Sequence, residues 1–251
     1  MSITEMGLQA VRRRIALAAE GAGRRPDSVE LVAVTKTFPA TVVVEAYGLG
    51  QVAFGESYAQ EAVEKIAAVR ALLERASSSG AYPVNSAVNA SAAPAGPPRW
   101  HFIGPVQSNK TRLLAEHVDW VHSIDRLKIA QRLSDQRPAQ LPELQVCIQV
   151  NVSAEGSKGG VQPDGARSLA EAIVALPHLR LRGLMAIPEP TPDGERQRSQ
   201  FAHLRKLLTQ LNSQGMRLDT LSMGMSDDLE AAIAEGATIV RVGRAIFGER
   251  V

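Results

Sequence analysis

A lysine directly follows an apolar run near the start of the chain. Lys36 comes immediately after residues 31–35 (LVAVT), a β-branched and apolar stretch typical of a buried strand. An ammonium group at the end of such a strand can be desolvated, which lowers the pKa of the amine, and a neutral amine can form a Schiff base with an aldehyde. The position equally suits a lysine that extends its charged end to water along an apolar surface, so Lys36 alone leaves both interpretations open.

Two glycine-containing segments near the end of the chain favour the binding of an anion. Ser226 lies where the pattern predicts the start of a helix, with the two following aspartates in its first turn. Gly224 and Gly243 allow the backbone to approach a ligand closely. Free amides at a helix start, together with a hydroxyl group, form an anion site, although a helix cap and a turn would use the same residues. Combined with Lys36, they indicate an aldehyde that also carries a phosphate, and pyridoxal 5′-phosphate (PLP) is such a molecule.

The elements that position these residues alternate between short apolar strands and amphipathic helices. Eight strands are expected, at residues 31–35, 52–54, 100–103, 120–122, 144–150, 181–186, 220–223 and 238–242. Helices are expected before them, where Leu8, Val11, Ile15 and Ala18 share one face, and between them at residues 59–76, 127–133, 166–176, 200–211 and 229–234. Near-continuous apolar strands separated by helices are typical of a parallel sheet covered on both faces. Eight such units in 251 residues favour a closed α/β (β/α)₈ TIM-like barrel, with an open doubly wound sheet as the alternative.

Barrels build their sites at the carboxyl-terminal ends of the strands, and they often bind phosphate after the seventh and eighth strands. Lys36, Ser226 and Gly243 all follow predicted strands, which places them on this face of the barrel. Ser57 and Gln60 follow the second strand and are spaced as a capping box for the next helix.

Residues 1–251 are predicted to form a single barrel domain with one flexible insertion. Residues 77–99 are rich in Ser, Ala, Pro and Gly and have no hydrophobic periodicity, so they cannot bury enough apolar surface to order themselves. The insertion precedes a strand, which puts it on the barrel face opposite the usual active site. Residues 156–160 (GSKGG) lack the spacing of a phosphate-binding loop and are expected to form a flexible turn.

Composition argues against several classes of function. The formal net charge is only +2 and aromatic residues make up 4%, whereas proteins that bind nucleic acid usually show a basic face or stacking aromatics. The chain has no secretory signal at its start and no apolar run long enough for a membrane helix.

Its single cysteine, Cys147, lies in an apolar run and is expected to be a core residue in a cytoplasmic protein. No two histidines have metal-ligand spacing, and His101 and His122 are expected to be satisfied core residues.

Several blocks of the sequence resemble a known family, the YggS/PROSC family of PLP homeostasis proteins. They occur in order along nearly the whole chain outside residues 77–99. The blocks are residues 32–36 (VAVTK), 54–56 (FGE), 101–104 (HFIG) with Gln107 and Asn109-Lys110, 182–185 (RGLM), 222–228 (SMGMSDD), 241–243 (RVG) and 246–248 (IFG).

The resemblance implies a barrel similar to that of alanine racemase and eukaryotic-type ornithine decarboxylase. It implies that Lys36 holds PLP through a Schiff base. It also implies that the phosphate is cradled by Ser226 and by backbone amides near Met225, Gly243 and Arg244.

The chain departs from the family pattern at two of these positions. Ser57 stands where the family usually has Asn, which puts a side-chain contact near the cofactor in question. Arg244 stands where the family usually has Thr or Ser, which puts a hydroxyl contact to the phosphate in question.

The resemblance also implies that Arg241 faces the pyridine nitrogen of PLP. A nearby cation keeps that nitrogen unprotonated and makes the ring a poorer electron sink.

The chain ends shortly after the eighth strand, and no second domain is expected to supply the further acid or base that a racemase needs. We therefore expect a cytoplasmic PLP-binding protein, a monomer or weak dimer, that buffers, carries or delivers PLP to apo-enzymes with little or no turnover. A small amino-acid racemase is the alternative, followed by an aldolase with a Schiff-base lysine.

Overall fold

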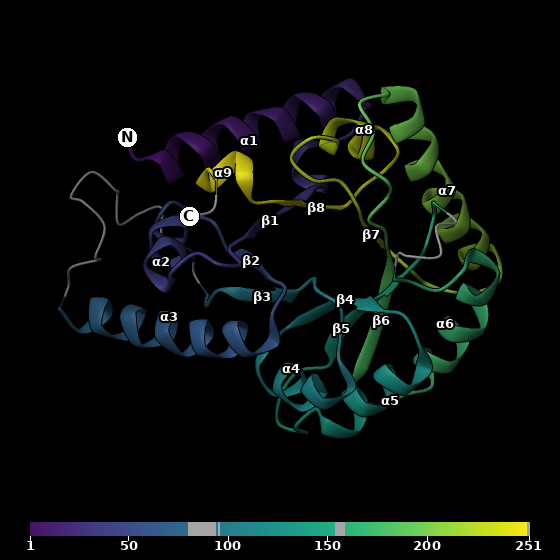
Figure 1. The fold of residues 1–251 in the computed structure, drawn as a ribbon, viewed down its shortest axis with the longest axis horizontal. Coiled ribbons are helices and arrows are strands. Elements are labelled where there is room, and N and C mark those ends of the chain that lie inside the picture. The colour runs from purple at the N-terminus through teal and green to yellow at the C-terminus, as the bar shows by residue number, and fades with distance from the viewer. Residues whose placement is uncertain (80–93, 95, 154–158, 250–251) are drawn as a thin grey trace.

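The computed structural model describes residues 1–79, 94, 96–153 and 159–249, which form alternating strands and helices (Figure 1). The strands are β1 (Glu30–Val34), β2 (Ala53–Glu56), β3 (Arg99–Phe102), β4 (Trp120–Ile124), β5 (Leu144–Gln149), β6 (Leu179–Met185), β7 (Thr220–Ser222) and β8 (Ile239–Val242). The helices are α1 (Ile3–Gly21), α2 (Ala40–Gly48), α3 (Ala59–Ser79), α4 (Thr111–His117), α5 (Leu127–Gln136), α6 (Ala166–Val174), α7 (Gly194–Ser213), α8 (Leu229–Ala234) and α9 (Arg244–Phe247).

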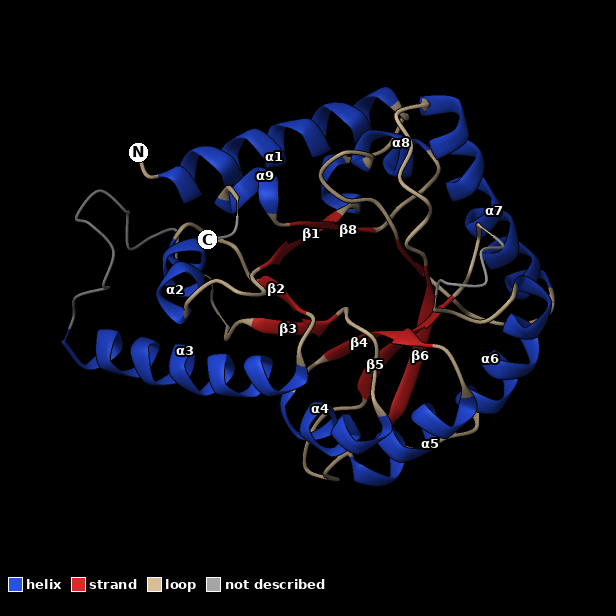
Figure 2. Ribbon diagram, viewed as in Figure 1, coloured by secondary structure: helices blue, strands red, loops and turns tan. Residues whose placement is uncertain are grey.

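The eight strands close into a parallel barrel in chain order, and Figure 2 shows the helices surrounding this ring of strands. Closure depends on β1, which pairs with β2 on one side and with β8 on the other. In the second pairing, Ala33 lies opposite Val242. The predicted (β/α)₈ barrel is confirmed, and the alternative of an open doubly wound sheet is wrong.

Alternate residues of each strand face opposite sides of the barrel wall, as strand geometry requires. One large apolar cluster joins the outer side of the strands to the helices. A small second cluster gathers Val32, Ala53, Trp120, Cys147, Met185 and Ile239. Cys147 is fully buried there, as predicted, and burial raises the pKa of its thiol to about 12. The thiol is therefore protonated and inert at neutral pH.

All eight predicted strands are present, with ends shifted by one or two residues, but some details of the helices differ. In α1, the fully buried residue of the last turn is Ala19, whereas the predicted Ala18 is only half-buried. Helix α7 begins six residues before its predicted start, at Gly194, because Asp193 caps it by accepting hydrogen bonds from the Glu195 and Arg196 amides. An aspartate cap of this kind lies outside the hydrophobic pattern that guided the prediction.

The predicted insertion at residues 77–99 is shorter at both ends than the composition indicates. Helix α3 continues through Ser79, and β3 already begins at Arg99. Tyr47 donates a hydrogen bond to the Gly96 carbonyl over 2.6 Å, which attaches the end of this segment to α2. Residues 80–93 and 95 lie outside the described residues, as does most of the predicted turn at 156–160, so both predictions of flexibility stand untested. No described helix combines the length and the apolar character needed to span a lipid bilayer.

Helix α1 packs against α9, the short helix that follows β8 and Gly243. The contact is close at Gly7, where an added Cβ atom would lie 2.3 Å from the Ile246 carbonyl oxygen. Gly21, at the other end of α1, has no atom within 4 Å of the same position. The two glycines therefore offer a matched pair of substitutions within one helix.

We expect Gly7→Ala to lower the free energy of unfolding by about 1–3 kcal/mol, because the methyl group must displace the α9 backbone. We expect Gly21→Ala to raise it by about 0.5–1 kcal/mol, because alanine favours the helix and nothing opposes the methyl group. Urea unfolding of both variants measures these changes. Equal effects of the two substitutions would contradict the close packing of α1 on α9.

Candidate functional site

Lys36 lies in the turn after β1, at the carboxyl-terminal end of the barrel, as predicted. It is half-buried and lines a cavity of about 590 Å³. The polar residues that share this lining are Ser57, Tyr58, Gln60, Gln107 and Lys110. The cavity is bounded by the ends of β2 and β3, so it extends from Lys36 away from β8.

The segments that carry Ser226 and Gly243 adjoin Lys36 because of the strand order. Gly243 directly follows β8, and an added Cβ there would lie 3.0 Å from the Val34 carbonyl oxygen. The Arg241 amide donates to the Gly224 carbonyl over 2.9 Å, which ties the end of β8 to the segment after β7. Barrel closure thus brings together residues separated by about two hundred positions in the sequence.

Unpaired hydrogen-bond donors gather on these two segments. Within the described part of the chain, the backbone N–H groups of Ser226, Gly243 and Arg244 donate no hydrogen bond, and the Ser226 hydroxyl makes none. The Ser226 carbonyl is held by Arg14 over 2.9 Å, and Arg14 in turn pairs with Glu230 at the start of α8. Donors fixed in place without acceptors are what an anion such as phosphate requires.

The expected helix start at Ser226 is wrong, and the Met225 amide already has an acceptor. Ser226 does not start a helix, because it lies in a turn and α8 begins only at Leu229. Both aspartates therefore precede the helix, and Asp228 occupies the cap position. The Asp228 carboxylate accepts a hydrogen bond from the Met225 amide over 2.5 Å, so this amide has a partner within the protein.

The two departures from the family pattern have different surroundings. The Arg244 side chain is about two-thirds exposed, and its guanidinium lies 3.7 Å from the Asp227 carboxylate at the surface. Ser57 lines the cavity beside Lys36, and the predicted capping box with Gln60 is absent. Helix α3 begins at Ala59, and the Gln60 side chain donates to Glu64 instead.

Arg241 is buried inside the barrel below these segments. Its guanidinium donates to Ser222 Oγ over 2.6 Å and to the Ala186 carbonyl over 3.0 Å. Among the described residues, no carboxylate forms an ion pair with it. Burial lowers the pKa of Arg241 to about 10, which still leaves it cationic at neutral pH.

Two histidines extend the hydrogen bonds of Arg241 across the barrel. His122 Nδ1 lies 2.7 Å from Ser222 Oγ, and His122 Nε2 lies 2.9 Å from His101 Nδ1. Both rings are fully buried, which lowers the pKa of His101 to about 3 and that of His122 well below its usual value. His101 was expected to be satisfied, yet its Nε2 atom has no partner among the described residues.

A buried ionic cluster beside Lys36 was missed by the sequence analysis. Lys65 on α3 donates to Glu56 on β2 over 2.7 Å and to Glu61 over 2.8 Å. A glutamate at the end of an apolar strand, with a Glu61–Lys65 pair one helical turn apart, was the signal available in the sequence. No group of three potential metal ligands occurs in the part of the chain that the structure describes.

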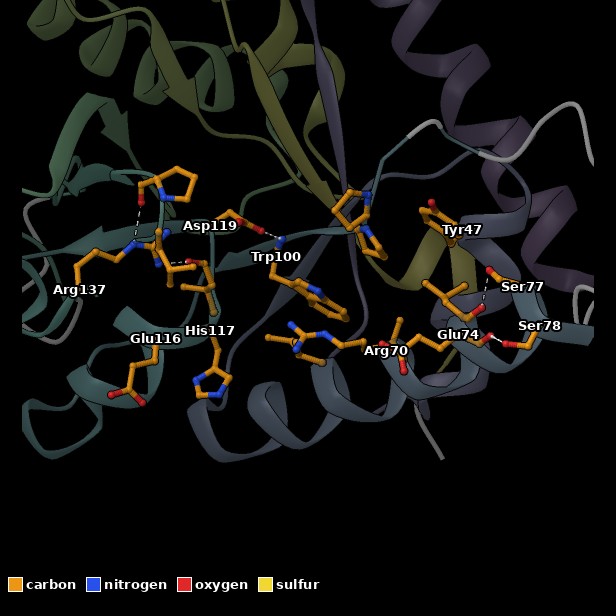
Figure 3. Close-up of a pocket in the computed structure, with 18 residues that line it drawn as sticks. Tyr47, Arg70, Glu74, Ser77, Ser78, Trp100, Glu116, His117, Asp119 and Arg137 are labelled. Carbon is orange, nitrogen blue, oxygen red and sulfur yellow. Dashed lines mark hydrogen bonds between the residues drawn. The ribbon is translucent and has the colours of Figure 1, made fainter. Parts of the chain in front are cut away.

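A larger cavity, of about 670 Å³, lies at the opposite end of the barrel between α3 and α4 (Figure 3). No lysine belongs to its described lining. Its buried charged groups hold the backbone, since Asp119 accepts from the Trp100 amide and Arg137 donates to the Ala115 and Val118 carbonyls. The chemistry of a reactive amine therefore points to the cavity beside Lys36 and not to this one.

Comparisons with known proteins agree with the barrel fold. The family model for the alanine racemase N-terminal domain matches residues 6–251. The PLP homeostasis protein of Pseudomonas aeruginosa is 55% identical over 250 residues, which cover 100% of this chain and 97% of that protein. The PLP homeostasis protein of Escherichia coli is 49% identical over 243 residues, 97% of this chain and 95% of that one.

The chain belongs to the PLP homeostasis protein family. A solved structure of PipY from Synechococcus elongatus with PLP bound is 32% identical, with a TM-score of 0.77 over 98% of this chain and 100% of that one. Alanine racemase from Corynebacterium glutamicum is 15% identical, with a TM-score of 0.63 over 96% of this chain and 61% of the racemase. At that identity the likeness extends to the barrel fold alone.

The buried histidines predict how the stability of this family member depends on pH. Their pKa values are lowered in the folded state. Below about pH 6.5 these histidines therefore become protonated in the unfolded chain while they stay neutral in the folded chain. The stability present above pH 6.5 is therefore lost as the pH falls. At pH 5 we expect a loss of about 2 kcal/mol from His101, and a further loss from His122.

Urea unfolding of the wild type and of His101→Gln between pH 7.5 and pH 5 measures this dependence. Carboxylates shared by the two proteins cancel in the difference between them, so the variant should lose less stability than the wild type as the pH falls. Parallel pH profiles would show that His101 is not a buried neutral histidine.

Proposed function

We propose that this chain binds PLP through Lys36 and serves intracellular PLP homeostasis by buffering, carrying or delivering the cofactor. The observation that carries the proposal is that the turn after β8, with unpaired donors at Gly243 and Arg244, lies against the end of β1, which Lys36 follows. The name of the relatives and the PLP bound in PipY support the choice of ligand. PLP would supply an aldehyde that the Lys36 amine attacks, and every other group acts by holding the molecule in place.

The phosphate would be held by Ser226, Gly243 and Arg244. Three backbone N–H groups and one hydroxyl provide directed donors, and hydrogen bonds to a charged acceptor are stronger than those to a neutral one. Arg244 contributes through its amide, because its guanidinium lies at the surface near Asp227. The Met225 amide already donates to Asp228, so Met225 would contribute only through contact with the ligand.

Arg241 would face the pyridine nitrogen, and its buried positive charge would keep that nitrogen unprotonated. An unprotonated ring is a poor electron sink, which supports a protein with little or no turnover. Slow racemisation of amino acids is the alternative activity to assay. Apo-enzymes that need PLP are the proposed recipients, and we propose a cytoplasmic monomer or weak dimer.

The first test is the absorbance of the purified protein between roughly 300 and 500 nm before and after addition of PLP. We expect a band near ~420 nm that borohydride removes, because a lysine–PLP Schiff base absorbs there and is reducible. Lys36→Ala should lose the trappable adduct and keep its fold, since the change lies at the barrel mouth. A trappable adduct in Lys36→Ala would exclude Lys36 as the attachment site.

The second test separates the two side chains near the phosphate. Ser226→Ala should raise the PLP dissociation constant by about tenfold to a hundredfold, the effect of losing one hydrogen bond to a charged group. Arg244→Ala should change it less than about threefold, because only its backbone amide contacts the phosphate. Titration followed by the visible band measures both constants. A larger effect for Arg244→Ala than for Ser226→Ala would reverse the proposed roles.

A further inference from the structure

The turn that carries Lys36 has a strained backbone. Thr37 has a φ angle of 70°, in the left-handed region that β-branched residues rarely adopt. Among the described non-glycine residues, only His178 shares a positive φ. Because this conformation costs an L-residue about 1–2 kcal/mol, interactions with neighbouring residues must hold the turn in place.

The ionic cluster of Glu56, Glu61 and Lys65 supplies those interactions on both sides of Lys36. After the lysine, the Thr37 amide donates to Glu61 Oε1 over 2.5 Å. Before it, the Thr35 carbonyl accepts from Lys65 Nζ over 2.6 Å. The Thr35 hydroxyl also donates to Glu56 Oε1 over 2.7 Å. Side chains of strand β2 and helix α3 thus form hydrogen bonds with both residues that flank Lys36.

All hydrogen-bond donors of the Lys65 side chain are used within this cluster. Its three donors are used by the Thr35 carbonyl, Glu56 and Glu61, and its side chain is only 5% exposed. A buried charge is costly unless it is paired and hydrogen-bonded. The buried Lys65 charge therefore favours the arrangement in which all three partners are in place. Lys65 therefore has no free donor with which to compete with Lys36 for an aldehyde.

We infer that Glu61 and Lys65, together with Glu56, are positioning residues that fix the direction of Lys36. They hold the strained turn so that the Lys36 amine meets the aldehyde while the phosphate is bound elsewhere. The inference rests on the proposed function, since the direction of Lys36 matters only if it bonds to PLP. The cluster acts on the backbone of its neighbours and does not touch the ligand.

The cluster could instead have a purely structural role, the attachment of α3 to the barrel. Measuring the binding of two ligands distinguishes this role from the positioning of Lys36. Pyridoxine 5′-phosphate has the ring and phosphate of PLP but an alcohol in place of the aldehyde, so it cannot bond to Lys36. Loss of positioning should weaken PLP binding and leave this analogue unaffected. General damage to the barrel should weaken both ligands.

The experiment compares Glu61→Ala, Glu61→Gln and a control, Glu64→Ala, which removes an exposed carboxylate one turn along the same helix. The Glu61 side chain is 30% exposed and Lys65 keeps its contacts with Glu56 and the Thr35 carbonyl, so melting temperatures report how much the loss of one Lys65 partner costs the fold. Dissociation constants for PLP and for pyridoxine 5′-phosphate are measured together with melting temperatures.

We expect Glu61→Ala to weaken PLP binding at least about tenfold, because the Thr37 amide loses its charge-assisted hydrogen bond to Glu61, with analogue affinity unchanged. Glu61→Gln should restore PLP binding, because its amide oxygen can still accept from the Thr37 amide. Glu64→Ala should match the wild type. Adding Thr37→Gly to Glu61→Ala should recover part of the loss, because glycine adopts the left-handed turn without strain.

Two results would overturn the inference while leaving the proposed function intact. One is a Glu61→Ala variant that binds PLP as the wild type does. The other is an equal loss for PLP and the analogue, or for Glu61→Ala and Glu61→Gln, because a damaged fold or a missing charge would then explain it. A wild-type protein that takes up no PLP would instead remove the proposed function and this inference together.

Discussion

The pairing of β1 with β8 is the constraint on which the rest of the site depends. It places Ala33 opposite Val242, so the turn with Lys36 and the turn with Gly243 leave the barrel side by side. In an open sheet these two strands could lie at opposite edges, and the lysine would face no anion site. Ring closure therefore does more than stabilise the core, because it brings Lys36 and the unpaired amides of Gly243 and Arg244 together from the two ends of the chain.

The barrel interior carries a second constraint, because it buries the Arg241 cation without an ion pair to any described carboxylate, and Asp228 acts on that charge only from a longer distance. Arg241 is held only by Ser222 and a carbonyl, and two neutral histidines continue the hydrogen bonds from Ser222. Such an arrangement is costly for stability, since apolar residues could fill the same space. A positive charge fixed beneath the mouth of the barrel is explained if it acts on the ring of a bound cofactor.

The strands, their order and Lys36 could be predicted because they depend on local patterns. Apolar runs of strand length alternate with helical periodicity, and a lysine at a strand end lies on a known face of the barrel. The ionic cluster of Glu56, Glu61 and Lys65 could not be predicted, since its bonds join a strand, a helix and a turn through single side chains. The use of the Met225 amide by Asp228 depends in the same way on one side chain reaching one backbone group. Side-chain hydrogen bonds of this kind leave no periodic trace in a sequence.

The central claim is that one lysine, held in a strained turn, is the point of PLP attachment. Peptide mapping by mass spectrometry after incubation with PLP and borohydride reduction tests it most directly. The account predicts one pyridoxyl group per chain, on the peptide that contains Lys36. Attachment to Lys110, which lines the same cavity, or an even distribution over surface lysines would contradict it.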